Sequence, residues 1–173
     1  MKGTFDIINQ MRADGVISHY AIGGAVGATF YLEPAATLDI DIFAILPYEP
    51  SGLISLGTIY DYLKARGGKV QDEHIVVEGW PVQFLVPANE LERDAVVNAV
   101  PARFDDITIW VMPENFLILI ALRTGRAKDH LRILQFLESG RLDQEDLEFL
   151  IKKYGLTDQW ERFNQRYREN ERE

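Results

Sequence analysis

Two aspartates spaced two positions apart, Asp39 and Asp41, lie within an otherwise apolar stretch of the chain. Residues i and i+2 of a β-strand point to the same face, so a strand over residues 37–46 would place both carboxylates on one face and its apolar side chains in a core. Two like charges held so close repel unless a cation neutralises them, and Mg²⁺, which prefers oxygen ligands, is the usual solution. The pair therefore predicts a site for a metal ion and phosphate groups.

A glycine pair, Gly23-Gly24, precedes the aspartates and supports this interpretation. The apolar residues 17–22 predict a strand that leads into the pair, and the small and apolar residues 25–32 predict a short helix after it. The acidic pair also has a simpler explanation, in which the carboxylates lie on the solvated face of an edge strand and prevent edge-to-edge association. The glycine turn beside an apolar strand favours the metal and phosphate site over that alternative.

Composition limits the other functions open to the chain. With 173 residues, 47% of them hydrophobic, the chain can bury a core in one domain with a small appendage. The absence of cysteine excludes a disulfide framework, and His19, His74 and His130 lack the paired spacing of a zinc site, so we expect ordinary surface or half-buried histidines. No apolar run is long enough to cross a membrane and no signal-peptide pattern is present. We therefore expect a soluble, cytoplasmic protein.

Charge argues against a large nonspecific nucleic-acid surface. The net charge is −9, whereas phosphate binding requires clustered lysines and arginines. One basic cluster is nevertheless present, because Arg123, Arg126 and Lys128 fall within six residues. Their spacing alone favours the polar rim of a helical hairpin.

The remaining patterns predict an α+β chain that changes character at Pro113. Helices and strands alternate before this residue, and every pattern after it is helical. We therefore expect a mixed α/β core over residues 1–112 and a helical subdomain over residues 113–173. A hairpin is expected where Glu78-Gly79-Trp80 joins two β-branched runs. The predicted helices cover residues 4–13, with Thr4 as N-cap, 25–32, 51–66 with Ser51 as N-cap, 89–100, 113–122, 128–138, 143–154 and 157–168. The predicted strands cover residues 17–22, 37–46, 73–77, 81–86 and 107–111.

Residues 22–25 (Ile-Gly-Gly-Ala), a short helix, and residues 37–42 (Thr-Leu-Asp-Ile-Asp-Ile) together resemble the signature of the DNA polymerase beta-like nucleotidyltransferase superfamily. In that superfamily a Gly-Gly or Gly-Ser turn precedes a strand with an Asp-x-Asp or Asp-x-Glu motif. The resemblance implies a nucleotidyltransferase-like mixed sheet with flanking helices. It also implies that Gly23 and Gly24 hold a nucleoside triphosphate, since a glycine turn lets backbone N–H groups approach phosphate. Asp39 and Asp41 would be the catalytic ligands of Mg²⁺.

A second stretch extends the resemblance over residues 17–135. Residues 113–115 (Pro-Glu-Asn), an apolar helix, and then Arg123, Gly125-Arg126 and Lys128-Asp129 are similar to the corresponding stretch of minimal nucleotidyltransferases. In this form the stretch resembles the toxin-type branch of abortive-infection and toxin–antitoxin systems. The resemblance implies a C-terminal helical bundle in which Arg123, Arg126 and Lys128 bind the triphosphate.

The sequence departs from the superfamily pattern at the third carboxylate. Active members carry an acid on a later antiparallel strand, where it completes the metal site and can serve as general base. That position corresponds to Gln83 here. An amide oxygen can bind a metal, so Gln83 is a candidate catalytic residue, but it cannot accept a proton. Ala25 also replaces a hydroxyl that contacts phosphate in many members.

Three functions follow from these patterns. The first is a Mg²⁺-dependent nucleotidyltransferase that moves a nucleoside monophosphate from an NTP to a hydroxyl of RNA, a protein or a small molecule, in a toxin–antitoxin or phage-defence system. The second is a catalytically degenerate member that binds a nucleotide or a cognate partner protein. The third is an antitoxin-like or scaffold module in which the carboxylates are incidental. The glycine turn and acidic pair favour the first over the third, whereas Gln83 favours the second.

Overall fold

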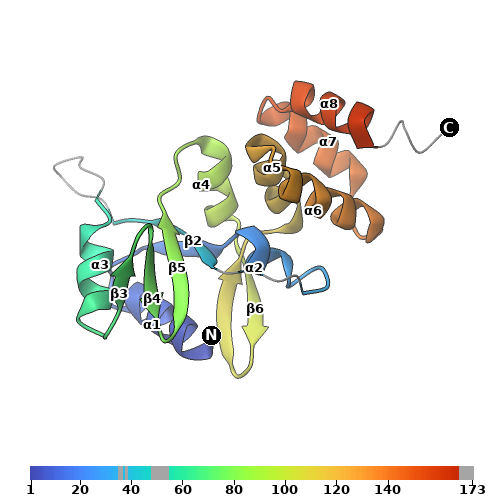
Figure 1. Cartoon of the computed structure of the whole chain (residues 1–173). Coiled ribbons are helices and arrows are strands. Elements are labelled where there is room, and N and C mark those ends of the chain that lie inside the picture. The colour runs from blue at the N-terminus through green and yellow to red at the C-terminus, as the bar shows by residue number, and fades with distance from the viewer. Residues whose placement is uncertain (35–36, 38, 48–54, 168–173) are drawn as a thin grey trace. The chain divides into compact units, whose positions relative to one another are not determined.

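The computed structural model describes residues 1–34, 37, 39–47 and 55–167 (Figure 1). The chain divides into two compact units, Met1–Met112 and Pro113–Glu173. The first unit contains both strands and helices, and the described residues of the second contain helices. None of the helices in the described part of the chain is long and apolar enough to cross a membrane.

One mixed sheet organises the first unit. Its strands are β1 (His19–Ile22), β2 (Ile40–Ile45), β3 (Lys69–Gln71), β4 (His74–Val77), β5 (Trp80–Leu85), β6 (Val100–Phe104) and β7 (Ile107–Val111). The strand order is β3-β4-β5-β2-β1-β7-β6. β2 pairs antiparallel with β1 and parallel with β5. The aspartate strand is therefore central in the sheet, and the alternative in which it is an acidic edge strand is wrong.

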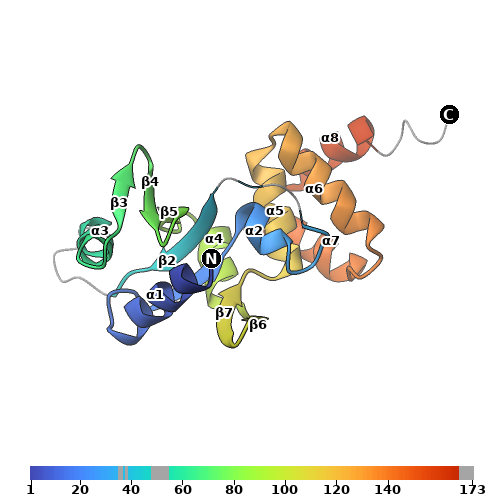
Figure 2. The same cartoon turned by 60° about the horizontal axis from the view of Figure 1, so that its bottom comes forward.

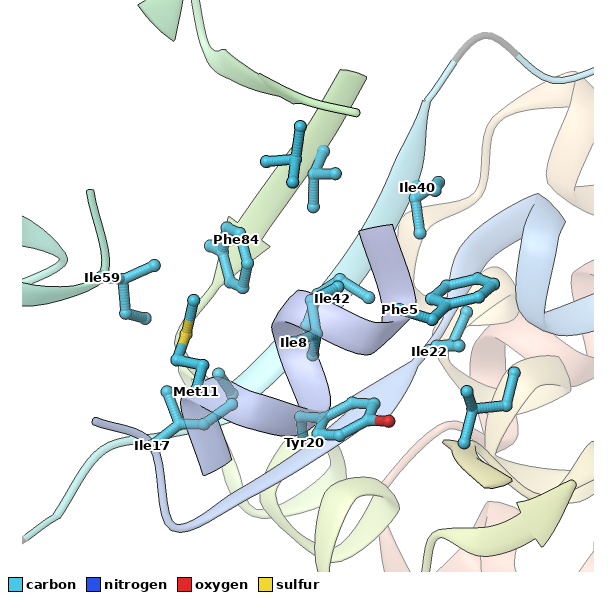
Figure 3. Packing of buried hydrophobic residues seen from close by; sticks show 14 of the residues in the cluster. Phe5, Ile8, Met11, Ile17, Tyr20, Ile22, Ile40, Ile42, Ile59 and Phe84 are labelled. Carbon is cyan, nitrogen blue, oxygen red and sulfur yellow. The ribbon is translucent and has the colours of Figure 1, made fainter. Parts of the chain in front are cut away.

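The main core of this unit lies between the sheet and helix α1 (Lys2–Ala13). Figure 3 shows Phe5, Ile8 and Met11, which recur every three residues along one face of α1, pointing toward apolar side chains of the sheet. Ile40 and Ile42 of β2 are both fully buried in this cluster. Helix α3 (Gly57–Lys64) contacts β3 and β4 and adds two buried residues, Ile59 and Leu63.

The other side of the central strands is covered in part by helix α4 (Glu90–Val97). In Figures 1 and 2, α1 and α4 lie on opposite sides of β2. The N-cap of α4 is Asn89, whose side chain accepts a hydrogen bond from the backbone N–H of Glu92. The short helix α2 (Gly24–Ala28) follows β1 and contacts β2. Both helices therefore pack near the strand that carries Asp41.

The second unit is built around the apolar helix α5 (Glu114–Thr124). It contacts α6 (Ala127–Glu138), α7 (Gln144–Lys153) and α8 (Thr157–Tyr167). Buried residues occur on every side of α5, which is typical of a helix enclosed by others. They are Phe116, Leu117, Ile118, Leu119, Ala121 and Leu122.

The predicted fold class, a mixed sheet with flanking helices followed by a C-terminal helical bundle, is confirmed. The Glu78-Gly79 turn has φ values of 51° and 81°, which is the two-residue hairpin geometry with both central residues left-handed. Thr4 is not the N-cap of α1. It lies inside the helix, fully buried, and its hydroxyl donates to the carbonyl oxygen of Val77 at 3.0 Å. The hydroxyl of Thr4 therefore bonds a distant strand and does not cap the helix.

Several boundaries differ from the sequence prediction. β1 begins at His19 and β2 at Ile40, so both strands are shorter than expected. β3 and β6 lie outside the predicted strands. Every residue of β3 is exposed, and β6 is a short strand of which Ala102 and Phe104 are partly buried against the core. The predicted cap Ser51 lies outside the described residues, and α3 begins at Gly57.

Tyr20 shows how the buried polar groups of the core are paired. Its side chain is buried, and its hydroxyl donates to Oδ1 of Asn9 at 2.7 Å. The amide of Asn9 donates in turn to the carbonyl oxygen of Thr108 at 2.8 Å. Burial raises the pKa of Tyr20 from 10.0 to about 12. The folded protein therefore favours the neutral phenol. Since the folded-state pKa exceeds the unfolded value, the stability that the neutral Tyr20 contributes is complete below pH 10 and is lost as the pH rises through 12.

We expect Tyr20→Phe to lower the free energy of unfolding by about 1 kcal/mol at pH 8, because the hydrogen bond to Asn9 is lost. Between pH 8 and pH 11 the free energy of unfolding of the wild type should fall by about 1 kcal/mol through ionisation of Tyr20 in the unfolded chain. The variant has no phenol at this position and should show no such decrease. Urea unfolding of both proteins at the two pH values measures the difference, which should shrink or reverse at pH 11. A constant difference would contradict the buried, neutral state of the phenol.

Candidate functional site

The carboxylate of Asp41 lies against the glycine turn that follows β1. The backbone N–H of Gly23 donates to the carbonyl oxygen of Asp41 at 2.9 Å, which ties the turn to β2. Gly24 has a φ of 56°, in the left-handed region that favours glycine. A Cβ at Gly24 would lie 1.9 Å from Oδ2 of Asp41, closer than non-bonded atoms approach. Asp41 thus occupies the space that a side chain at position 24 would need.

The register of the sheet places Gln83 beside Asp41. β2 and β5 are parallel, and Asp41 pairs with Gln83. Paired residues on neighbouring strands point to the same face, so both polar side chains share one face of the sheet. Ile42, which follows Asp41, and Val82, which precedes Gln83, are fully buried and point to the opposite face. The acid and the amide therefore lie side by side on the face of the sheet that is opposite the main core.

Asp39 lies one residue before β2 and is not part of the strand, contrary to the predicted strand over residues 37–46. Nε2 of His74 is 3.2 Å from Oδ2 of Asp39, and the two side chains are 29% and 39% exposed. His74 is the first residue of β4. The antiparallel register of β4 with β5, continued by one position, places His74 opposite Gln83. His74 therefore connects Asp39 to the polar face that carries Asp41.

His74 is the site residue that the sequence patterns did not identify. The position of His74 beside Gln83 can be predicted from the sequence. In a hairpin with the Glu78-Gly79 turn, Val77 pairs with Trp80, and three positions further out His74 lies opposite Gln83. Its contact with Asp39 has no such signal. It depends on the parallel pairing of β5 with β2, which joins segments far apart in the sequence.

The oxygen atoms of the site suit a hard cation that receives the rest of its coordination shell from a bound substrate and water. Asp39 and Asp41 offer carboxylate oxygens, and Gln83 offers an amide oxygen. Within the described residues, no group of three or more His, Cys, Asp and Glu side chains is arranged to hold a metal ion. Mg²⁺ is commonly held by one or two carboxylates, with water and substrate phosphates completing an octahedral shell. The described residues therefore suit Mg²⁺ that shares its coordination shell with a phosphate-bearing ligand better than Mg²⁺ held by the protein alone.

The three basic candidates lie in the second unit, where two of them contact neighbouring residues. Nη2 of Arg123 donates to the carbonyl oxygen of Tyr154 at 3.4 Å. Nε of Arg126 donates to Oδ2 of the buried Asp129 at 2.7 Å, while the Arg126 side chain stays 58% exposed. Lys128 is exposed in the first turn of α6. Arg126 and Lys128 thus present positive charge to solvent at the start of α6.

The sheet, its flanking helices and the helices that follow define a nucleotidyltransferase-like α+β fold. The chain resembles the solution structure of the antibiotic-resistance factor ANT(2'')-Ia, an aminoglycoside nucleotidyltransferase. The match has a TM-score of 0.51 and 14% sequence identity, and it covers 86% of each chain. No protein-family model matches the chain, and no curated protein matches it in sequence. This similarity establishes the fold, whereas the roles of single residues rest on the geometry above.

Gly24→Ala tests the contact between the glycine turn and Asp41. Alanine is strained at a φ of 56°, and its Cβ would displace the Asp41 carboxylate. Gly15→Ala is the matched control, because Gly15 has a φ of 76° but no atom within 4 Å of its Cβ position. We expect Gly15→Ala to lower the free energy of unfolding by about 1 kcal/mol and Gly24→Ala by about 3 kcal/mol in urea titrations. Equal losses would show that Asp41 tolerates a side chain at position 24.

Proposed function

We propose that the protein is a Mg²⁺-dependent nucleotidyltransferase that moves a nucleoside monophosphate from an NTP to a hydroxyl acceptor. The observation that carries the proposal is the contact between the Asp41 carboxylate and the bare backbone of Gly24. It occurs in a chain whose fold is nucleotidyltransferase-like. A fold alone does not define a function, so the proposal rests on the conjunction of the fold with this contact.

In the proposed reaction, the acceptor oxygen forms a bond to the α-phosphorus of the NTP. The bond from that phosphorus to the β-phosphate oxygen breaks, and pyrophosphate leaves. Bound Mg²⁺ would neutralise charge on the phosphates and align them for in-line attack. Asp39 and Asp41 would hold the ion. Gly24 would let the triphosphate approach Asp41 without a side chain in the way, and Gly23, whose N–H donates to Asp41, would shape the turn.

Gln83 favours a second candidate function, a catalytically degenerate protein that binds a nucleotide or a partner protein. Its amide is paired with Asp41 in the sheet register, on a strand that is parallel to β2 and antiparallel to β4. We take Gln83 to stand where the resemblance expects a third carboxylate. An amide oxygen can contribute to a metal site, but it cannot take the proton of the attacking hydroxyl. In the active function that proton would pass to water, so we expect slow transfer by the natural protein.

Charge favours a small-molecule or protein acceptor over a long RNA. The first 112 residues contain 15 acidic and seven basic residues. Long nucleic acids bind through many cations that displace counterions, and this unit offers few. We assign the exposed Arg126 and Lys128, together with Arg123, to the triphosphate instead of an RNA acceptor. Use of an NTP as donor would place the reaction in the cytoplasm.

The second part of the resemblance supports a more specific role. Arg123, Gly125-Arg126 and Lys128-Asp129 resemble the corresponding stretch of the toxin-type branch of minimal nucleotidyltransferases. We therefore propose that the protein belongs to a toxin–antitoxin or phage-defence system and has a cognate partner protein. Co-expression with genes adjacent to its own, followed by purification, would identify a stable complex.

Asp41→Asn tests the proposed metal site. A thermal-shift screen of the four NTPs should identify one that raises the Tm of the wild type when Mg²⁺ is present and not when it is absent. Asp41→Asn should lose this shift, because removing an anionic ligand from a site with few others weakens coordination severely. Asp61→Asn, at an exposed position of α3, is the control and should keep it. An unchanged shift in Asp41→Asn would exclude Asp41 as a metal ligand.

Gln83→Asp tests whether the missing carboxylate limits turnover. The substitution puts a proton-accepting oxygen on the same face as Asp41, and general-base catalysis typically contributes about 10²-fold or more. Transfer of radiolabel from an NTP to candidate acceptors should rise by about that factor. Gln83→Asn, which has the size of aspartate but no charge, should show no gain. Faster transfer by the natural protein than by Gln83→Asp would show that the glutamine is itself a working ligand.

A further inference from the structure

The two aspartates of the site are held in different ways. Asp41 belongs to β2, is paired in the ladder with β5, and lies against Gly24. Asp39 precedes the strand, and the hydroxyl of Thr37 donates to its backbone carbonyl at 3.1 Å. This contact leaves the Asp39 carboxylate free to rotate about its side-chain bonds. The contact that restrains the carboxylate is the one with Nε2 of His74, at 3.2 Å.

His74 is well placed to restrain a neighbour because its own backbone lies between two strands. It pairs with Gln71 of β3 on one side, and on the other side the β4–β5 ladder begins at the next residue, Ile75. The imidazole is half-buried, with 29% of the side chain exposed. A carboxylate oxygen accepts hydrogen bonds, so Nε2 is the donor in the tautomer that makes this contact a hydrogen bond.

We propose that His74 is a positioning residue of the metal site, which donates Nε2–H to Oδ2 of Asp39 and thereby fixes the orientation of a carboxylate that would bind the ion together with Asp41. This inference rests on the proposed function, since it concerns the same site. Groups that hydrogen-bond to metal-ligating carboxylates fix their orientation, and losing such a group typically weakens metal binding 10–100-fold. Asp41 is restrained because it belongs to β2, whereas Asp39 is restrained by its hydrogen bond with His74.

Stability alone does not account for the contact. Both side chains are partly exposed, at 29% and 39%, and ion pairs in such positions contribute little to folding because water and salt screen them. A structural role would change the Tm and leave metal affinity unchanged. A positioning role would lower metal affinity and leave the Tm unchanged. Measuring both quantities therefore separates the two roles.

The experiment is a titration of the purified protein with Mn²⁺, a paramagnetic hard cation that stands in for Mg²⁺, followed by electron paramagnetic resonance. We expect His74→Ala to weaken Mn²⁺ binding by about 10–100-fold with little change in Tm. His74→Gln, whose amide can donate from a position close to that of Nε2, should recover most of the loss. His19→Ala, at the exposed first residue of β1, is the matched control and should bind as the wild type does. The double variant Asp39→Ala/His74→Ala should bind no more weakly than Asp39→Ala.

The outcomes separate this inference from the proposed function. If the wild type binds Mn²⁺ and His74→Ala binds it equally well, the positioning role is wrong and the metal site stands. If His74→Ala weakens binding by the same factor in the Asp39→Ala background, His74 does not act through Asp39, and the inference also fails. If the wild type binds no Mn²⁺, the metal site itself is wrong and both proposals fall.

Discussion

The candidate site depends on the space that Gly24 leaves for the carboxylate of Asp41. Two independent constraints meet at this glycine, a φ of 56° and a Cβ position 1.9 Å from Oδ2 of Asp41. The N–H of Gly23 donates to the carbonyl oxygen of Asp41, so the turn and the strand hold one another. A side chain at position 24 would disturb the backbone of the turn and the position of the acid together.

The strand that carries Asp41 couples the site to the stability of the first unit. Ile40 and Ile42 are fully buried against α1, while Asp41 between them points to the polar face. A slip of β2 by one residue would move every side chain to the opposite face, so the isoleucines would leave the main core and the acid would enter it. The hydrophobic core therefore enforces the register that pairs Asp41 with Gln83.

The second unit contains a buried carboxylate that is paired with two arginines. Asp129 is 1% exposed and accepts hydrogen bonds from Arg126 at 2.7 Å and from Arg132 at 3.4 Å. Burying a carboxylate is costly unless it is paired, and two guanidinium groups supply that pairing. The network has two positive charges for one negative charge, and the Arg126 side chain stays 58% exposed. Arg126 is thus both a structural partner of Asp129 and a source of positive charge at the surface.

The sequence by itself determined the elements whose signals are local. Periodicity along the chain predicted α1 and the helices after Pro113, and the Glu78-Gly79 turn predicted its hairpin, because helical spacing and left-handed backbone depend on a few neighbouring residues. The tertiary structure decided β3 and β6, the burial of Thr4 and the contact of His74 with Asp39. Each of these depends on a partner far along the chain. Local pattern cannot encode such a partner, since strand register and side-chain contacts between distant segments are set by how the whole sheet assembles.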